Sequence, residues 1–489
     1  MKAILAIDQG TTSTRAIAFS TDGKKLFSSQ LEFKQYFPKN GWVEHNPNEI
    51  WVKTLKVIKN VKNKCKKNKI KIITIGITNQ RETTVLWDKT NGKPVYNAIV
   101  WQDRRTENYC KKIKNKENLI RKKTGLFIDP YFSATKIKWV LDNVTKAKRL
   151  LKKNLLLFGT IDSFLIWKLT GGKLHATDAT NASRTMLFNL NKNKWDHDIL
   201  KIFKIKKNIL PVVKNSADNF GFTSRRILGK KISISAVLGD QQAAAVGQGC
   251  FEKGSVKSTY GTGAFVIMNT GNKKLISKNR LLSTICYRLN NKTTYALEGS
   301  IFIAGAGVQW LRDKIKLIKN AHETENILRS KKNNQGIYLV PAFTGLGAPY
   351  WRPNSRGLIT GLTRNSDWKD LVRAVVESVA YQSYDLFNSM RKDGLKPKIV
   401  KVDGGMVANN WFSQFLSDII NLKVTRPKIL ETTALGVALF AGYQAGEFKS
   451  LTQIKNIWKK DRIFYPKLNK SLRNNLLQGW KLAIRKTLA

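Results

Sequence analysis

A run of eight residues near the N-terminus concentrates groups that bind phosphate and metal ions. It reads Asp8-Gln9-Gly10-Thr11-Thr12-Ser13-Thr14-Arg15 and lies between two short apolar runs. Glycine lets the backbone turn sharply, and backbone N–H groups with threonine hydroxyls suit phosphate oxygens. An aspartate at a strand end can hold Mg²⁺ through water, and the Arg15 guanidinium can meet a phosphate oxygen. The segment indicates a phosphate-binding turn, although an ordinary hydroxyl-rich hairpin has the same composition.

Two further glycine turns follow in the second half of the chain. Tyr260-Gly261-Thr262-Gly263 repeats the glycine–threonine pattern, and Val402-Asp403-Gly404-Gly405 leads into a helix, with Asn409 close behind. Plain turns between elements explain either segment in isolation. Together with the first turn they favour a nucleotide held between two facing domains, each of which presents a hydroxyl-lined turn to its phosphates.

One carboxylate has the position expected of a general base. Asp240 follows the apolar run 232–238 in the segment Gly239-Asp240-Gln241-Gln242. A carboxylate at a strand end can take the proton from a substrate hydroxyl as its oxygen attacks a phosphorus atom. The alternative is that Asp240 caps the alanine-rich helix that follows.

The pattern of apolar residues predicts two similar units that position these turns. In the first half we expect strands over residues 3–8, 15–20, 26–33 and 70–78 and a helix over 48–62. In the second half we expect strands over 254–260, 264–269, 293–299 and 399–402 and helices over 305–312, 368–393 and 411–420. The two units suggest two related α/β domains, with a boundary near residues 247–254, where glycines cluster.

The charge of the chain is strongly positive, with 87 Lys and Arg against 33 Asp and Glu and a formal net charge of +54. A nucleic-acid or anionic-membrane binder is one interpretation. Lysines are spread over the whole chain, however, and the crowded segments 61–71 and 111–123 lack the interleaved aromatic residues that stack bases. We therefore expect no specific nucleic-acid partner.

Other residue types argue against metal centres and membrane spans. The four Cys and the four His form no metal-ligand spacing, and the Cys suggest reduced thiols in a cytosolic enzyme. The chain has no run of about 18 apolar residues, so the sequence predicts no membrane span. The patterns GxxxxGK[ST], HRD with DFG, and GxGxxG do not occur, which argues against P-loop enzymes, protein kinases and dinucleotide-binding proteins.

Taken together, these segments resemble the FGGY carbohydrate kinases over nearly the whole chain. The residues that carry the resemblance are Asp8–Arg15, Asn79–Thr84, Trp101–Arg105, Gly159–Ser163, Thr180–Met186, Gly239–Gln242 and Phe343–Trp351. The Arg81-Glu82 pair and the segment around Trp101 resemble the members of the family that act on glycerol rather than on a pentose.

The resemblance implies a fold of two ribonuclease-H-like domains, as in actin-like ATPases, with the active site in the cleft between them. The polyol-binding domain would span residues 1–250 and the nucleotide-binding domain residues 251–489. The implied reaction is phosphorylation of glycerol to sn-glycerol 3-phosphate, with ATP and Mg²⁺. The resemblance also implies a cytoplasmic location and a homo-oligomer, either a dimer or a tetramer.

The resemblance also implies a role for individual residues. Asp240 would be the catalytic base and Asp8 would belong to the Mg²⁺ site. Residues that would contact the substrate are Arg81, Glu82, Trp101, Tyr131, Asp240, Gln241 and Phe265. Residues that would bind ATP are Thr11, Thr12, Ser13, Arg15, Thr262, Gly305, Gln309, Gly405 and Asn409. The alternatives are another FGGY sugar or polyol kinase and an actin- or Hsp70-like ATPase that needs no polyol.

Overall fold

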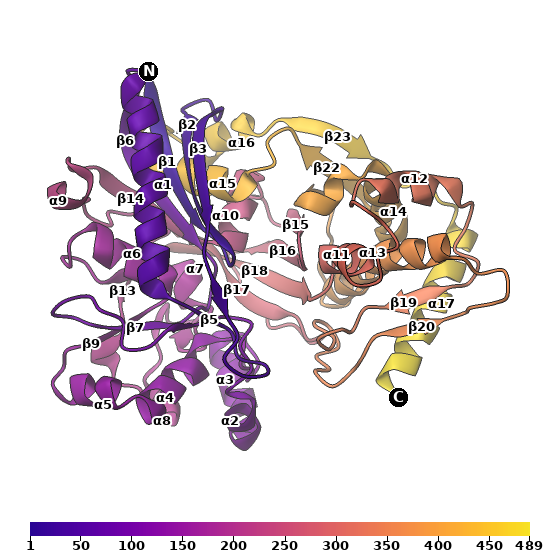
Figure 1. Cartoon of the computed structure of the whole chain (residues 1–489), viewed down its shortest axis with the longest axis horizontal. Helices are drawn as coiled ribbons and strands as arrows, with labels where there is room; N and C mark the ends of the chain where they lie inside the picture. The colour runs from indigo at the N-terminus through magenta and orange to yellow at the C-terminus, as the bar shows by residue number, and fades with distance from the viewer.

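A computed structural model describes residues 1–489 and contains two large sheets (Figure 1). The first sheet has the strand order β14-β6-β1-β2-β3. Its strands are β1 (Lys2–Gln9), β2 (Ser13–Ser20), β3 (Lys25–Glu32), β6 (Lys71–Asn79) and β14 (Ser233–Gly239). Strands β1 to β3 form an antiparallel meander, and β6 and β14 run parallel to β1. The predicted meander and the predicted strand over 70–78 are confirmed.

The second sheet repeats this arrangement and extends it, with the order β17-β18-β16-β15-β21-β22-β23. Its strands are β15 (Val256–Tyr260), β16 (Ala264–Gly271), β17 (Leu282–Leu289), β18 (Lys292–Ile301), β21 (Ile399–Asp403), β22 (Lys423–Pro427) and β23 (Lys460–Phe464). Strands β15, β16 and β18 form the meander, and β21 runs parallel to β15. The predicted strands are confirmed, but β17, with every residue buried, was not among them.

Amphipathic helices cover both sheets and begin at residues that cap them. Helix α1 (Pro47–Lys67) packs on β2 and β3, and Asn46 accepts hydrogen bonds from the first backbone N–H groups. Helix α13 (Trp368–Lys392) begins with a capping box of Asp367 and Asp370 and packs against α14 (Asn410–Ile420). The predicted helices in these regions are confirmed, together with α11 (Gly305–Asp313).

Two helices lie between the sheets and join the halves of the chain. Helix α10 (Asp240–Gly247) follows the first sheet, and α15 (Thr432–Gln444) returns from the second half to pack on α10, β1, β6 and β14. The helices touch backbone to backbone, since a Cβ atom on Gly436 would lie 1.8 Å from the Ala243 carbonyl oxygen. Only glycine permits this approach. The predicted domain division after residue 250 falls between α10 and β15 and stays a prediction.

The remaining elements form a helical layer beside the first sheet and the outer edge of the second half. They are β4 (Gln35–Tyr36), β5 (Glu44–His45), β7 (Val85–Asp88), β8 (Ala98–Ile99), α2 (Glu107–Lys112), α3 (Glu117–Thr124), α4 (Ser133–Asn143), α5 (Thr145–Lys152), β9 (Leu156–Gly159), α6 (Ile161–Leu169), β10 (Ala176–Asp178), α7 (Ala179–Ala182), β11 (Phe188–Asn189), β12 (Lys194–Trp195), α8 (His197–Phe203), β13 (Val212–Lys214), α9 (Arg225–Leu228), α12 (Glu323–Ser330), β19 (Tyr338–Val340), β20 (Leu358–Thr360), α16 (Leu451–Ile457) and α17 (Lys470–Leu488). None of the helices combines the length and the apolar composition needed to cross a membrane.

Candidate active site

Three parallel strands of the first sheet end at one edge and bring the predicted site residues together. Asp8 pairs with Thr78 near the end of β1, and Asn79 at the end of β6 pairs with Gly239 at the end of β14. Arg81 and Glu82 follow β6 directly, and Asp240 follows β14. Because ligands of open α/β sheets bind at the carboxyl ends of the strands, this edge is the expected place for a substrate.

Arg81 is the centre of a buried polar cluster that spans both halves of the chain. Its Nε atom lies 3.2 Å from Oδ1 of Asp240. Its Nη1 and Nη2 atoms donate to the two carboxylate oxygens of Glu298 on β18, at 2.6 and 2.8 Å. The planar guanidinium is held from two sides by this paired geometry, which is the strong form of an ion pair.

Glu82 is fixed by a second arginine, Arg184, which lies in the segment Thr180–Met186 that carries the resemblance but was given no role in the site. Nε of Arg184 donates to Oε1 of Glu82 at 2.6 Å, and Nη2 of Arg184 lies 3.3 Å from Glu298. Glu82 has a φ of +62°, an uncommon backbone conformation for a residue with a side chain, and such strain is often found at functional sites.

The positive charges near this cluster are those of Arg81, Arg184 and Lys257, and they oppose the carboxylates of Glu82, Glu298 and Asp240. Burial would raise the pKa of Glu298, but Arg184 and Arg81 outweigh it and hold that pKa at about 2. Burial also raises the pKa of Glu82, against the opposing effect of the same two arginines. A neutral, hydrogen-bonded network is the condition under which charges persist in a protein interior.

Three aromatic side chains form a wall next to the polar cluster. The ring centroid of Trp101 lies 5.7 Å from that of Tyr131 and 6.1 Å from that of Phe265, both edge to face. Nε1 of Trp101 donates to Oγ1 of Thr11 at 3.0 Å. The structure thus connects the residues predicted to contact the substrate with the first predicted phosphate turn, and Phe265 brings the second half of the chain to the same place.

Asp240 is oriented toward Arg81 and does not cap its helix. Helix α10 begins at Asp240 itself, with Gly239 in the capping position and no side-chain capping bond. Oδ1 of Asp240 accepts from the N–H group of Gln241 at 2.7 Å, and 28% of the side chain is exposed. Burial raises the pKa of Asp240, and the positive charges of Arg81 and Lys257 act against this rise. The helix-cap alternative is therefore wrong for this side chain.

The first phosphate turn lies beside a group of acidic residues. The N–H group of Gly10 donates to the carbonyl oxygen of Ser13 at 2.9 Å and closes the turn. Nη1 of Arg15 bonds to Glu431, just before α15. Burial raises the pKa of Asp8, the effect of Arg15 opposes the rise, and the nearby carboxylates of Asp240 and Glu431 add to it, so that the pKa lies at about 6. A divalent cation would favour the ionised form of Asp8, but no group of three or more His, Cys, Asp or Glu side chains converges to hold one, so Asp8 could hold Mg²⁺ only through water, and its metal role stays a prediction.

A cavity of about 490 Å³ in the second half contains the other predicted ATP residues. They are Thr262, Gly305, Gln309, Gly405 and Asn409. The N–H group of Gly305 donates to the carbonyl oxygen of Gly261 at 2.8 Å, and a Cβ atom on Gly305 would lie only 2.6 Å from that oxygen. The volume is within the range of small-molecule sites, roughly 300–1,000 Å³. The predicted ATP residues are thus divided between this cavity and the first turn, where Thr11, Thr12, Ser13 and Arg15 lie.

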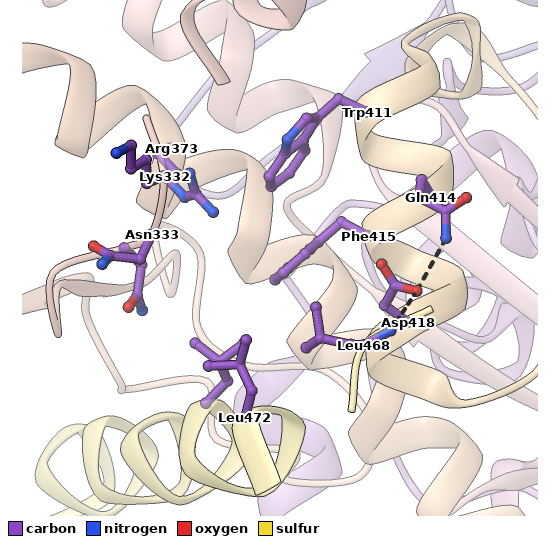
Figure 2. A pocket seen from close by; sticks show the side chains of 11 residues that line it. Lys332, Asn333, Arg373, Trp411, Gln414, Phe415, Asp418, Leu468 and Leu472 are labelled. Atoms are coloured by element: carbon purple, nitrogen blue, oxygen red, sulfur yellow. Dashed lines mark hydrogen bonds between the residues drawn. The ribbon is translucent and has the colours of Figure 1, made fainter. Parts of the chain in front are cut away.

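A second cavity, of about 240 Å³, contains none of the predicted residues. Figure 2 shows Trp411 and Phe415 of α14 on one wall, with leucines at the base. The rings of Trp411 and Phe415 are stacked, with their centroids 4.9 Å apart. Two of the charged groups here are already engaged, since Arg373 donates to Glu377 at 2.6 Å and Asp418 accepts from Gln414 at 3.0 Å.

Sequence reasoning missed three charged residues that support the site. They are Arg184, Lys257 and Glu298, all of them buried. Lys257 and Glu298 lie within strands that are otherwise mostly apolar or hydroxyl-bearing, and a charged residue inside a buried strand needs a partner. That signal identifies the residues as unusual, but it does not say which partner each one has.

The buried His45 should make stability depend on pH. Its Nε2 bonds to Oε1 of Gln35 at 2.6 Å, and its Nδ1 faces Nε2 of Gln80 at 3.4 Å. Burial lowers the pKa of His45 to about 4 from its ordinary 6.5. As pH falls, His45 is therefore protonated in the unfolded chain before it is protonated in the folded protein. The free energy of unfolding decreases between pH 6.5 and pH 4 as a result. From pH 7.5 to pH 5 we expect this histidine to cost roughly 2 kcal/mol.

Urea unfolding at the two pH values measures this effect in wild type and in His45→Asn, which cannot titrate. The variant should lose less stability on acidification than the wild-type protein. An equal loss in both proteins would show that His45 does not contribute.

Comparison with known proteins shows similarity along the whole chain. The model of the FGGY family of carbohydrate kinases matches residues 3–247 with its N-terminal domain and residues 256–445 with its C-terminal domain. A protein named glycerol kinase from Coxiella burnetii is 53% identical over 488 residues, which cover 99% of this chain and 97% of that protein. Another, from Alteromonas mediterranea, is 55% identical over 484 residues, 98% of each chain.

Solved structures agree with the sequence comparison. The structure of Plasmodium falciparum glycerol kinase with ADP superimposes with a TM-score of 0.94 at 40% identity, over 100% of this chain and 99% of that one. The structure of gluconate kinase from Lactobacillus acidophilus has a TM-score of 0.88 at 22% identity, over 99% and 97% of the two chains. The latter similarity concerns the fold alone.

Proposed function

Because the chain belongs to the FGGY family of carbohydrate kinases, we propose that it transfers the γ-phosphoryl group of ATP to glycerol and forms sn-glycerol 3-phosphate. The observation that carries the proposal is the cluster in which buried Arg81 joins Asp240 to Glu298, beside Glu82 and an aromatic wall. Similarity over nearly the full length to proteins named glycerol kinase supports glycerol as the acceptor.

The chemistry of glycerol fits both the polar cluster around Arg81 and the aromatic wall next to it. Glycerol has three hydroxyl groups and a short carbon edge. Arg81 and Asp240 would bind the hydroxyl that reacts, while Glu82, Tyr131 and Gln241 would bind the others. Trp101 and Phe265 would contact the carbon atoms. A buried site that pairs each hydroxyl rejects analogues that lack one, because the unmatched protein group would stay desolvated.

Asp240 is the base of the proposed reaction. It takes the proton of the bound hydroxyl as that oxygen forms a bond to the γ-phosphorus, and the bond from this phosphorus to the β–γ bridging oxygen breaks to release ADP. Burial raises the pKa of Asp240, and the positive charges of Arg81 and Lys257 oppose that rise and so favour the ionised form that can accept a proton. Phosphoryl transfer otherwise depends on positioning and on neutralisation of charge.

ATP would occupy the 490 Å³ cavity and extend its phosphates toward the N-terminal turn. Gly405 and Asn409, which follow β21, and Thr262, which follows β15, all line this cavity. Thr11, Thr12, Ser13 and Arg15 would meet the phosphates from the other half. Asp8 would hold Mg²⁺, which when bound offsets the negative charge of the triphosphate. The cytoplasmic location and the dimer or tetramer inferred from the resemblance belong to the same proposal.

A coupled ATP assay tests the proposal on purified protein. ADP should form only when glycerol and Mg²⁺ are both present, and the panel of acceptors should include xylulose, gluconate and a blank without polyol. Faster turnover of xylulose or gluconate would make the chain another FGGY kinase. Steady ATP hydrolysis in the blank would favour an ATPase that needs no polyol.

A further inference from the structure

Lys257 is a completely buried lysine at the place where the two halves meet. It lies in the middle of β15, has a relative exposure of 0%, and donates from Nζ to Oε1 of Gln241 on α10. Lysine is rarely buried unless its charge is paired. The ammonium group carries three donors, so a single amide acceptor does not account for its position.

Charged groups from four elements surround this ammonium. Burial lowers the pKa of Lys257, and Asp403 on β21, Asp240 on α10 and Glu298 on β18 act against that shift, while Arg81 adds to it. The thiol of Cys250 also responds to the positive charge of Lys257. Three carboxylates thus oppose the effects of burial and of one guanidinium on Lys257, and Lys257 in turn is one of the charges that lower the pKa of Asp240.

The hydrogen bond to Gln241 acts on the first turn of α10. Gln241 is the residue after Asp240, and its backbone N–H group donates to the Asp240 carboxylate at 2.7 Å. A bond from β15 to the Gln241 side chain therefore fixes the turn that carries Asp240. Since β15 belongs to the second sheet and α10 follows the first, the bond also ties the position of this turn to the packing of the two halves.

We propose that Lys257 is a positioning residue for phosphoryl transfer, which fixes Gln241 through a hydrogen bond and provides the positive charge that faces the Asp240 carboxylate. The inference rests on the proposed function, in which Asp240 is the base and Gln241 contacts the acceptor. It assigns two separable contributions to one side chain. The bond orients the acceptor, and the charge favours the ionised form of the base.

Three substitutions separate these contributions. Lys257→Met removes the bond and the charge, Lys257→Gln keeps a donor for Gln241 without the charge, and Lys257→Arg keeps the charge. We expect Lys257→Met to raise KM for glycerol and to lower kcat, each by about 10-fold or more, with KM for ATP near the wild-type value. Lys257→Gln should recover the KM for glycerol but keep the low kcat.

The pH profile of kcat provides a readout that a purely structural role would not change. Without the ammonium, Arg81 and the N–H group of Gln241 still oppose the effect of burial on Asp240, while the carboxylates of Glu298 and Asp8 add to that effect. The pKa of Asp240 therefore rises, and the base becomes protonated at higher pH. The acid limb should therefore move to higher pH in Lys257→Met and Lys257→Gln and stay in place in Lys257→Arg. Glu298, Asp403 and Cys250 are unchanged in all three variants.

Lys401→Met is the matched control. Lys401 pairs with Lys257 in the parallel register of β15 and β21, but its Nζ bonds to the carbonyl oxygen of Gln248 outside the site. This variant should keep the wild-type kinetics and pH profile. Thermal unfolding of every variant identifies a folding defect, and if Lys257→Met does not fold, the comparison of Lys257→Gln with Lys257→Arg decides.

The proposal would be overturned if Lys257→Gln had the wild-type kcat, KM and pH profile. It would also be overturned if Lys401→Met lost as much kcat as the Lys257 variants. Failure of the proposed function is a different result, because it appears in the wild-type protein as an absence of turnover with glycerol. In that case the same variants are measured with the acceptor that the wild-type protein does use.

Discussion

Replacing Asp240 with asparagine is expected to lower kcat with glycerol by about 10²–10⁴-fold, the usual contribution of a general base. Asparagine has the same shape, and its carbonyl oxygen can still accept from Arg81 and from the N–H group of Gln241. It cannot take a proton from the hydroxyl. The ATP cavity is formed by other residues, so the Kd for ATP should change little. Steady-state kinetics and titration of ATP binding measure the two effects.

The thermal midpoint of Asp240→Asn distinguishes catalysis from folding. Asp240 makes no helix-cap bond, so the variant should unfold near the wild-type temperature. Near-normal turnover in a folded variant would contradict the role of Asp240 as the base.

The second large effect is expected at Glu298, which holds Arg81 with both carboxylate oxygens. Glu298→Gln replaces one acceptor by an N–H donor that opposes the guanidinium, and it leaves the two arginines with the carboxylates of Glu82 and Asp240 alone. Removal of one partner of a buried ion pair costs about 3–5 kcal/mol of stability. Because Arg81 is expected to bind the reacting hydroxyl, kcat/KM for glycerol should fall by about 10²–10³-fold.

Glu377→Gln provides a matched control for this substitution. Glu377 is also buried and accepts from Arg373 at 2.6 Å, and Arg373 lines the second cavity (Figure 2), away from the candidate active site. The control should lose stability in urea while its KM for glycerol stays at the wild-type value. Equal losses of kcat/KM in both variants would show that the effect of Glu298 is general destabilisation.

Much of the fold can be predicted from the sequence because local patterns determine it. The strands around Asp8 and Tyr260 end at glycine turns, and the capping residues before α1 and α13 mark where those helices begin. The return of α15 onto the first sheet could not be predicted, because it depends on a close contact between Gly436 and Ala243, almost 200 residues apart. Strand β17 was missed because both of its faces are buried and its polar residues, such as Ser283, Thr284 and Arg288, do not alternate with apolar ones.

The candidate site shows the same division between local and distant information. Asp8, Arg81 and Asp240 are recognisable because Asp8 lies near the end of an apolar strand and the other two come just after one. Glu298 could not be assigned, because its partner Arg81 is 217 positions away. Lys257 and Arg184 are similar cases, since their function depends on neighbours that only the packing of the two halves provides.

A crystal structure with glycerol, Mg²⁺ and a non-hydrolysable ATP analogue tests the central claim most directly. The account predicts one glycerol hydroxyl within about 2.6–3.2 Å of the Asp240 carboxylate, with Arg81 on the same oxygen. The nucleotide should lie in the 490 Å³ cavity and extend its terminal phosphate past Thr262 toward that hydroxyl. Glycerol bound away from Arg81 and Asp240, or a terminal phosphate directed away from Asp240, would contradict it.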